Sequence, residues 1–224
     1  MGWYLGNTSS SGGSGVQSVT GLNTDNTDPQ NPEVKMSVAN GITGAGTPAS
    51  PLIASNRGLY SQTANSVPVT ATTSELSLIG AGVGTLSVPA NGFSVGDSFL
   101  AKLYGDISCV GTATIQIRVK SGSVILADTG VIALDVTTNK HWGIEVSFTI
   151  RALGIAGVGS IVSSGLFSYI KNSGLNFEGA NFSILNNSTF NTTILNTLDI
   201  TAQWNTNNAG NTILSELFVL NKIY

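Results

Sequence analysis

Several segments of the sequence alternate strictly between apolar and polar residues. Between Trp142 and Ile150 every second residue is apolar, and the residues between them are small or polar. Side chains of a β-strand point alternately to its two faces, so this pattern predicts a strand with one buried and one exposed face. Two further segments share the pattern, with apolar residues at Ala113, Ile115, Ile117 and Val119 and at Leu198, Ile200, Ala202 and Trp204.

From about residue 75 onward, short strand-like segments are separated by turn residues such as Asn91-Gly92, Ser121-Gly122 and Thr129-Gly130. No convincing amphipathic helix interrupts them. We therefore predict an all-β fold, an antiparallel jelly-roll sandwich that forms a head domain over residues 74–224. The expected strands lie near 75–80, 84–88, 98–109, 112–120, 123–128, 131–135, 142–152, 158–170, 175–184, 193–204 and 213–223.

The first 73 residues have a different composition. They are rich in Gly, Ser, Thr, Asn and Pro, show no sustained periodicity and are not expected to bury a core. The run Ser9–Gly15 has the composition of a flexible hinge. We predict an N-terminal anchor peptide with its hinge over residues 1–15, and an extended linker or shaft over 16–73. This segment serves either as a tether or as a shaft that becomes ordered against copies of itself.

The last predicted strand, residues 213–223, is apolar on both faces. A strand of this kind needs cover on both sides. One side can be the sandwich core, and the other is covered either by the chain's own loops or by a neighbouring subunit of a homotrimer. The alternation places Leu214, Phe218 and Leu220 on one face. The candidate trimer-interface residues, on the opposite face, are Leu217, Val219 and Ile223.

Charged residues make up only 9% of the sequence, against ~25% in ordinary soluble domains, and Asn, Thr, Ser and Gly supply the polar surface. Such a surface suits extended β structure exposed outside a cell. The net charge of −3 gives no basic footprint for nucleic acid. No apolar run reaches the ~18 residues needed for membrane insertion. The first seven residues lack the features of a signal peptide, so release by lysis as part of a particle is expected.

Candidate catalytic and metal-binding residues are sparse. Cys109 and His141 are each the single residue of their type, so neither an intrachain disulfide nor a Cys/His zinc site is expected. Glycan hydrolysis needs two carboxylates about 5–9.5 Å apart, and no sequence feature pairs any two acids. Asp25 and Asp28 lie in a short loop that suits Ca²⁺, although an Asx turn before Pro29 explains it equally well. We expect no cofactor and no enzymatic activity.

A compact apolar triplet, Trp3, Tyr4 and Leu5, stands near the start of the sequence and precedes the Ser/Gly hinge. These side chains are candidate particle-anchoring residues, because aromatic groups can dock into a pocket of a larger partner while the hinge lets the body swing. The alternative is a disordered chain end without a role, as termini commonly are.

Several segments carry a resemblance to viral fibre proteins. Gly15–Pro32 resembles N-terminal segments in fibre proteins of tailed bacteriophages. Val88–Phe93, Gly96–Lys102, Ile117–Gly130 and the strand that begins at Trp142 resemble the C-terminal head domains of phage and large-virus fibres. Those heads are similar in fold to tumour-necrosis-factor-like or complement-globular jelly rolls and are commonly trimeric.

The resemblance implies a structural protein on the exterior surface of a virion. It implies a homotrimer fastened by its N-terminus to a capsid, neck or tail protein, with the head presented to host-surface or environmental glycans. Contact is expected at polar loops, especially Asn205–Asn211 and Asn186–Asn191, because binding surfaces are commonly carried on loops over a rigid scaffold. Two alternatives remain: a capsid-decoration or baseplate component without a receptor role, and a glycan-degrading tailspike.

Overall fold

The computed structural model describes residues 24–25, 33–34, 42–43, 53–54, 58–171 and 176–224. The chain forms two units, Met1–Arg57 and Gly58–Tyr224. In the first unit, β1 (Thr24–Asp25) pairs with β2 (Glu33–Val34), and β3 (Ile42–Thr43) pairs with β4 (Ile53–Ala54). The anchor peptide and most of the linker that the sequence predicts lie outside the described residues.

The described residues of the second unit form an all-β fold with antiparallel sheets, as predicted. All of the strand pairings are antiparallel. The strands are β5 (Tyr60–Gln62), β6 (Val69–Thr70), β7 (Leu76–Ser77), β8 (Gly82–Gly84), β9 (Ser87–Val88), β10 (Ser98–Cys109), β11 (Thr114–Ser121), β12 (Val124–Asp128), β13 (Ile132–Ala133), β14 (Thr137–Ala152), β15 (Ser160–Ile170), β16 (Phe177–Asn186), β17 (Asn196–Trp204) and β18 (Thr212–Lys222).

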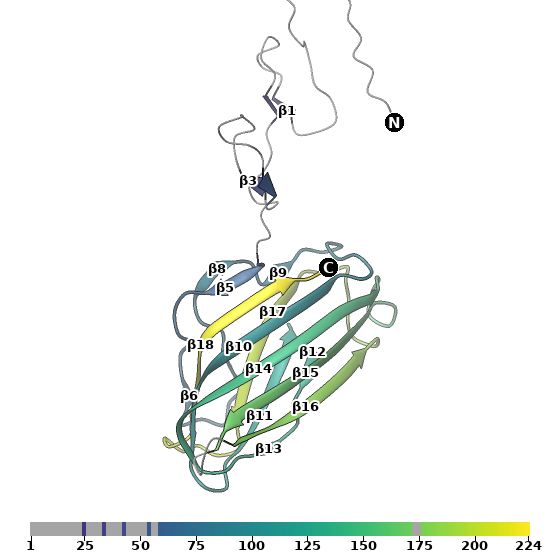
Figure 1. Cartoon of the computed structure of the whole chain (residues 1–224). Helices are drawn as coiled ribbons and strands as arrows, with labels where there is room; N and C mark the ends of the chain where they lie inside the picture. Colours follow the sequence, from purple (N-terminus) through teal and green to yellow (C-terminus); the bar gives the residue numbers. More distant parts are fainter. Residues whose placement is uncertain (1–23, 26–32, 35–41, 44–52, 55–57, 172–175) are drawn as a thin grey trace, which may run out of the picture. The chain divides into compact units, whose positions relative to one another are not determined.

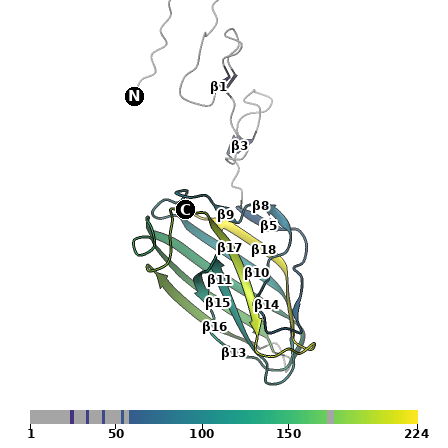
Figure 2. The same cartoon turned by 180° about the vertical axis from the view of Figure 1, so that it is seen from behind.

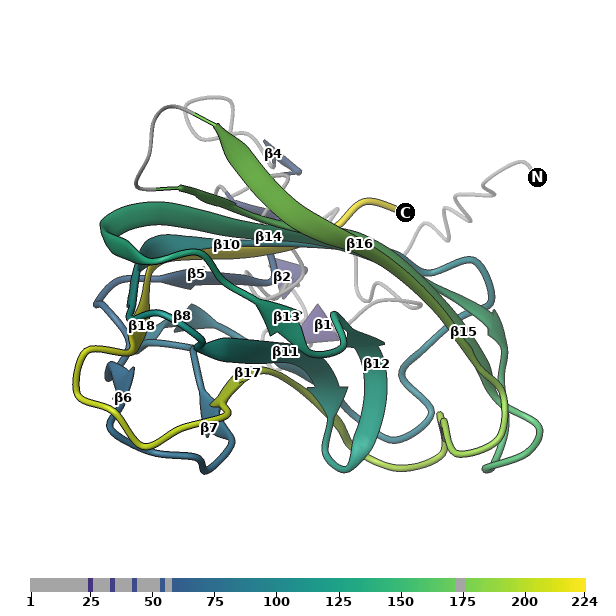
Figure 3. The same ribbon diagram turned by 90° about the horizontal axis from the view of Figure 1, so that it is seen from below.

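These strands form two sheets that face each other. The larger sheet has the order β16-β15-β14-β10-β18-β5-β8, with β6 also paired to β18. The smaller sheet has the order β12-β11-β17-β7, with β13 on β11 and β9 on β17. Figures 1 and 2 view the sandwich from its two sides, and Figure 3 shows the two layers along their edges.

The strand order follows a regular rule once β6, β8, β9, β13 and the hairpin β15–β16 are set aside. The eight strands that remain are, in chain order, β5, β7, β10, β11, β12, β14, β17 and β18. The first, eighth, third and sixth of them are neighbours in the larger sheet, and the second, seventh, fourth and fifth are neighbours in the smaller one. The hairpin β15–β16, inserted between the sixth and seventh strands, extends the larger sheet beyond β14.

The core lies between the sheets, on the faces that the alternation predicts. The apolar positions of β14, from Trp142 to Ile150, are all buried, as are those of β11 and β17. Both buried tryptophans also satisfy their indole N–H groups. Trp142 donates to the carbonyls of Asp106 and Leu214, and Trp204 donates to that of Val69 at 3.0 Å. Each large aromatic residue therefore adds buried area without leaving a polar atom unpaired.

Charged residues on the outer face of the smaller sheet hold its short edge strand β7 in place. Arg118 and Lys120 of β11 lie 2.9 Å and 3.0 Å from the two carboxylate oxygens of Glu75, and the Thr201 hydroxyl of β17 donates to the same carboxylate. Burial acts to raise the pKa of Glu75, but the hydrogen bonds from Thr201 and Lys120 and the two positive charges outweigh it and lower the pKa. The partly buried carboxylate is therefore ionised, and both of its oxygens are bound by positively charged or hydroxyl groups.

The sandwich begins at Gly58 rather than at residue 74, the boundary that the sequence predicts. Tyr60 and Val69 are buried in the core, and both β5 and β6 pair with β18. These strands are only three and two residues long. Their positions are fixed by pairing with residues about 150 positions away (Leu220↔Tyr60, Ile213↔Val69). A strand of this length shows no periodicity in the sequence, which is why composition alone placed these residues in the linker.

One residue of β18 faces the opposite way from the prediction. Leu214 was expected beside Phe218 and Leu220, yet it lies on the outer face and is half-buried. The register with β10 shifts at this point, because Tyr104 pairs with Leu217 while Gly105 pairs with Ser215. The bulge inserts one extra residue and reverses the alternation on its N-terminal side. Gly105 permits it, since a Cβ at this position would lie 2.1 Å from the Leu214 carbonyl oxygen.

Truncation tests where the sandwich begins. We predict that deleting residues 1–57 leaves a cooperatively folding protein, whereas deleting residues 1–73 lowers the free energy of unfolding by about 3 kcal/mol or more. The longer deletion removes β5 and β6 and two buried side chains, each of which contributes on the order of 1.5–3 kcal/mol. Urea unfolding followed by tryptophan fluorescence measures the difference. Equal stability of the two truncated proteins would restore the boundary at residue 74.

Candidate binding surface on the larger sheet

The outer face of the larger sheet is the candidate functional surface. In the middle of this sheet, Tyr104 of β10 lies between Leu217 of β18 and Gly143 of β14, and Lys102 lies between Val219 and Glu145. No described element of the second unit crosses this face, so within that unit β18, β10, β14, β15 and β16 lie open side by side (Figure 1). We call this area the open face.

The open face carries exposed apolar side chains among its polar ones. Leu166, Leu185 and Leu217 are 54%, 52% and 47% exposed. Half-buried aliphatic residues share this face, and polar residues such as Ser147, Ser164 and Asn181 lie among them. The half-buried aliphatic residues are Leu100, Val162, Ile170, Leu214 and Val219. Antiparallel sheets that are solvated on one side normally carry polar residues there. Apolar side chains exposed on one face in this way make it a candidate surface for contact with a partner.

A fixed polar group occupies the centre of the open face. The Tyr104 hydroxyl donates a hydrogen bond to the Glu145 carboxylate, and the Lys102 ammonium lies 3.2 Å from both oxygens of that carboxylate. Gly143 makes room for the tyrosine, since a Cβ there would lie 2.6 Å from the ring. The His141 ring is nearly parallel to that of Tyr104, with 5.7 Å between the ring centroids. The tyrosine ring therefore lies over the backbone of β14.

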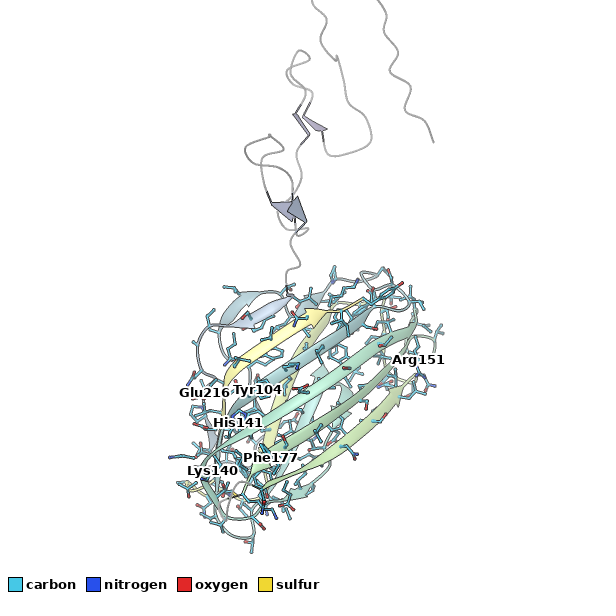
Figure 4. All side chains as sticks on the ribbon, in the orientation of Figure 1. Tyr104, Lys140, His141, Arg151, Phe177 and Glu216 are labelled. Carbon is cyan, nitrogen blue, oxygen red and sulfur yellow. The ribbon has the colours of Figure 1, made fainter. Side chains whose placement is uncertain are left out.

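Further exposed groups surround this centre. Figure 4 shows Phe177 and Glu216 in the same half of the sheet as Tyr104 and His141, while Arg151 lies toward its other end. The open face therefore combines apolar side chains with a few charges of both signs.

The electrostatics of the centre suit binding rather than proton transfer near neutral pH. Burial, followed by the hydrogen bond to Glu145 and its negative charge, raises the pKa of Tyr104 to about 12. The hydrogen bond from Tyr104, together with the hydrogen bond and charge of Lys102, lowers the pKa of Glu145 against the effect of its burial. The tyrosine stays a donor and the glutamate stays ionised, so the group holds one geometry over the physiological range.

The predicted interface residues lie on the open face or at its margin. Val219 is half-buried, Leu217 is exposed, and both belong to β18 on the open face. Ile223 follows the end of β18 and is 58% exposed. The anchoring candidates Trp3, Tyr4 and Leu5 lie outside the described residues. Sequence reasoning missed Lys102, Tyr104 and Glu145.

Other residues with potentially catalytic or metal-binding side chains make contacts that stabilise the fold. Cys109 is buried, its thiol donates to the Asp135 carbonyl, and burial raises its pKa. Asp97 lies 2.7 Å from Lys222, and Asp128 lies 3.5 Å from Arg118. Among the residues that the structure describes, no three His, Cys, Asp or Glu side chains are grouped to hold a metal ion. The loop proposed for Ca²⁺ is not covered, because Asp28 and the side chain of Asp25 lie outside these residues.

The two polar loops expected to bind a ligand lie at opposite ends of the sandwich. The strands β14 and β18 both run antiparallel to β10, so their C-terminal ends lie at the same end of the sheet. Asn186–Asn191 lies there, because Asn186 pairs with Ile161 at the start of β15. Asn205–Asn211 precedes β18 and lies at the other end.

The second of these loops is tightly built. Asn205 exchanges hydrogen bonds with Thr114, accepting from its N–H through the side chain and donating to its carbonyl from the backbone. Asn211 is fully buried and accepts from the backbone N–H of Val110. The residues between them, 206–210, are exposed. The loop therefore presents amides and hydroxyls from a fixed base.

Comparisons of the chain with models of protein families, with curated proteins and with solved structures gave no match. Over the ranges that the structure describes, it contains no helix with the length and apolar character that crossing a membrane would require.

The central group makes a prediction for alkaline pH. Because the folded state holds the pKa of Tyr104 at about 12, against 10.0 for an ordinary tyrosine, its contribution to stability is complete below pH 10 and is lost as the pH rises to 12. The Tyr104→Phe variant should lose less stability over this range. Urea unfolding at a series of pH values measures this slope. Ser147→Ala, on the same face, is the control and should keep the wild-type slope, and identical slopes for Tyr104→Phe and wild type would contradict the prediction.

Proposed function

We propose that this chain is a structural fibre protein of a virion, whose head is a trimeric jelly roll on the particle exterior. The open face is the observation that carries the proposal, because a rigid sandwich has left one apolar sheet surface uncovered. In this proposal, the N-terminal residues attach the protein to the particle. The head contacts host-surface or environmental glycans.

The strand order supports the assignment as a jelly roll. In a jelly roll of eight strands, two Greek keys place the chain alternately in two four-stranded sheets. The order of first, eighth, third and sixth strands in one sheet, and second, seventh, fourth and fifth in the other, is the order of β5-β18-β10-β14 and β7-β17-β11-β12. The hairpin β15–β16 is then an addition to the sheet that carries the open face.

The two outer faces of the sandwich support a trimer that uses the larger sheet. On the smaller sheet, the charged side chains around Glu75 already satisfy one another. On the larger sheet, Leu217 and Val219 have no such partner among the described residues; Val219 lies beside Lys102, and Leu217 lies beside Tyr104. Three copies arranged around a threefold axis would remove these side chains from water.

The polar loop at the far end of the sandwich is the surface that we assign to attachment. The chain reaches the sandwich at Gly58, beside Asn221 near the end of β18, whereas Asn205–Asn211 lies at the other end. If the N-terminal residues hold the particle, this loop can face the surroundings. Amides and hydroxyls suit the hydroxyl groups of glycans, and many weak contacts on one particle together give firm adhesion.

The same features are compatible with a capsid-decoration or baseplate component without a receptor role, on the head, neck or tail of the particle. Imaging of intact particles with a label on the chain distinguishes these positions. A glycan-degrading tailspike is the remaining alternative, and turnover of host polysaccharide by the purified protein would favour it.

The trimer can be tested with one matched pair of variants. We predict that the wild-type protein sediments at three times the mass of the chain at micromolar concentration. Leu217→Glu should produce a folded monomer, because it places three carboxylates in the proposed interface. Leu76→Glu makes the same exchange at a residue of similar exposure on the smaller sheet (44% against 47%) and should leave the trimer intact. A monomeric wild-type protein, or a trimeric Leu217→Glu variant, would contradict the prediction.

Particle attachment makes a separate prediction. Replacing Trp3, Tyr4 and Leu5 together by alanine should reduce incorporation into particles at least tenfold, because the apolar groups that dock are lost. The thermal unfolding of the head should not change. Quantitative immunoblotting of purified particles measures incorporation, and replacement of Ser9, Ser10 and Ser11 by alanine is the control. Full incorporation of the first variant would remove these residues as the anchor.

A further inference from the structure

A cavity of about 60 Å³ lies between the two sheets, at the end of the sandwich that contains Gly58. Three buried phenylalanines, Phe99, Phe148 and Phe190, and the half-exposed Phe93 form part of its wall. Phe99 stacks on Phe148 with 5.4 Å between ring centroids, and Phe93 meets Phe99 edge to face at 6.1 Å. Because both sheets contribute aliphatic residues to the remaining wall, the cavity is continuous with the core.

In the deep part of the cavity, no polar group of the described residues is free to form a strong hydrogen bond with a bound molecule. The buried polar residues there are Ser121 and Asn196, and the Ser121 hydroxyl donates to the Asn196 side chain at 2.9 Å. The Asn196 amide in turn donates to the carbonyls of Asn191 and Ile194. A buried water needs two to four polar partners, so this space favours an apolar guest over water.

The cavity can be reached from solvent. Leu59, Leu86, Val88 and Phe93 line it and are only half-buried, whereas the side chains deeper inside, such as Leu126 and Leu198, are buried. These half-buried residues form the rim. A guest can therefore enter past the rim without crossing the sheet.

We propose that this cavity binds the end of an aliphatic chain. Cavities of about 150 Å³ with walls of this kind admit benzene. At about 60 Å³, the space suits a narrower group, a few carbons long, with the rest of the chain leaving past the rim. The inference is independent of the proposed function, since it concerns the interior of a single sandwich.

The experiment uses the full chain and n-alkanols from ethanol to octanol as probes. Leucine methyl groups labelled with ¹³C report binding by NMR, because Leu59, Leu86, Leu126, Leu198 and Leu220 line the cavity while Leu103 and Leu134 do not. We expect shifts confined to the first five residues. Affinity should rise about fourfold for each added methylene, from its transfer free energy of ~0.8 kcal/mol, and level off once the space is filled.

Two variants separate binding in the cavity from binding elsewhere. Leu126→Phe adds volume inside the cavity and should abolish the shifts, whereas Leu166→Phe makes the same exchange on the open face and should retain them. If Leu126→Phe does not fold, the second measurement is the binding of xenon under pressure to the wild-type protein. Xenon should shift the methyl resonances of the same five leucines. The proposal is overturned by a wild type that responds to neither probe, by shifts spread evenly over all leucines, or by full binding in Leu126→Phe.

Discussion

The register of β10 between β14 and β18 is the constraint on which the rest of the structure depends. Its inward residues, such as Phe99 and Leu103, supply the centre of the core, and its outward residues Lys102 and Tyr104 form the centre of the open face. The bulge opposite Gly105 sets which side chains of β18 point outward. Since side chains alternate with a period of two, a shift of one residue would turn Leu217 and Val219 into the core and Phe218 out of it.

The charged residues of the two outer faces differ in their surroundings, and this difference carries the functional argument. On the smaller sheet, Arg118, Lys120 and Glu75 satisfy one another and stabilise the short strand β7. On the larger sheet, the pair Lys102 and Glu145 lies between the half-buried Val219 and the exposed Leu166. Exposed ion pairs contribute little to stability, so this pair is better understood as fixing the position of Tyr104. Among the described residues, the charges on the smaller sheet satisfy one another, whereas the larger sheet leaves apolar side chains exposed.

The sequence alone predicted those structural features that depend on residues close together in the chain. The alternation from Trp142 to Ile150 spans several residues, so the strand and its buried face could be predicted from nearest neighbours. The same holds for β10, whose predicted range 98–109 coincides with Ser98–Cys109. By contrast, β5 and β6 are too short to carry a pattern and exist because β18 pairs with them.

The candidate surface could not be predicted, because it depends on register. Lys102 and Glu145 are 43 positions apart in the sequence and meet only when β10 and β14 pair with this offset. One signal was present: Gly143 occupies an outward position of an otherwise regular strand, and a glycine within a strand commonly marks a close approach of another group. That group is the ring of Tyr104.

The end of the sandwich that contains Gly58 carries an exposed apolar turn, which agrees with the proposed orientation. At the end that contains Gly58, the turn after β14 exposes Leu153, Ile155 and Val158, which are 43%, 60% and 58% accessible. Hydrogen bonds between Gly154 and Thr192 hold this turn against the segment before β17. An amide-rich loop is present at each end, Asn186–Asn191 here and Asn205–Asn211 at the other end. Exposure of apolar side chains to water is unfavourable, so a partner that covers the turn after β14 would stabilise the assembly. A head whose Gly58 end meets other parts of a particle provides such a partner.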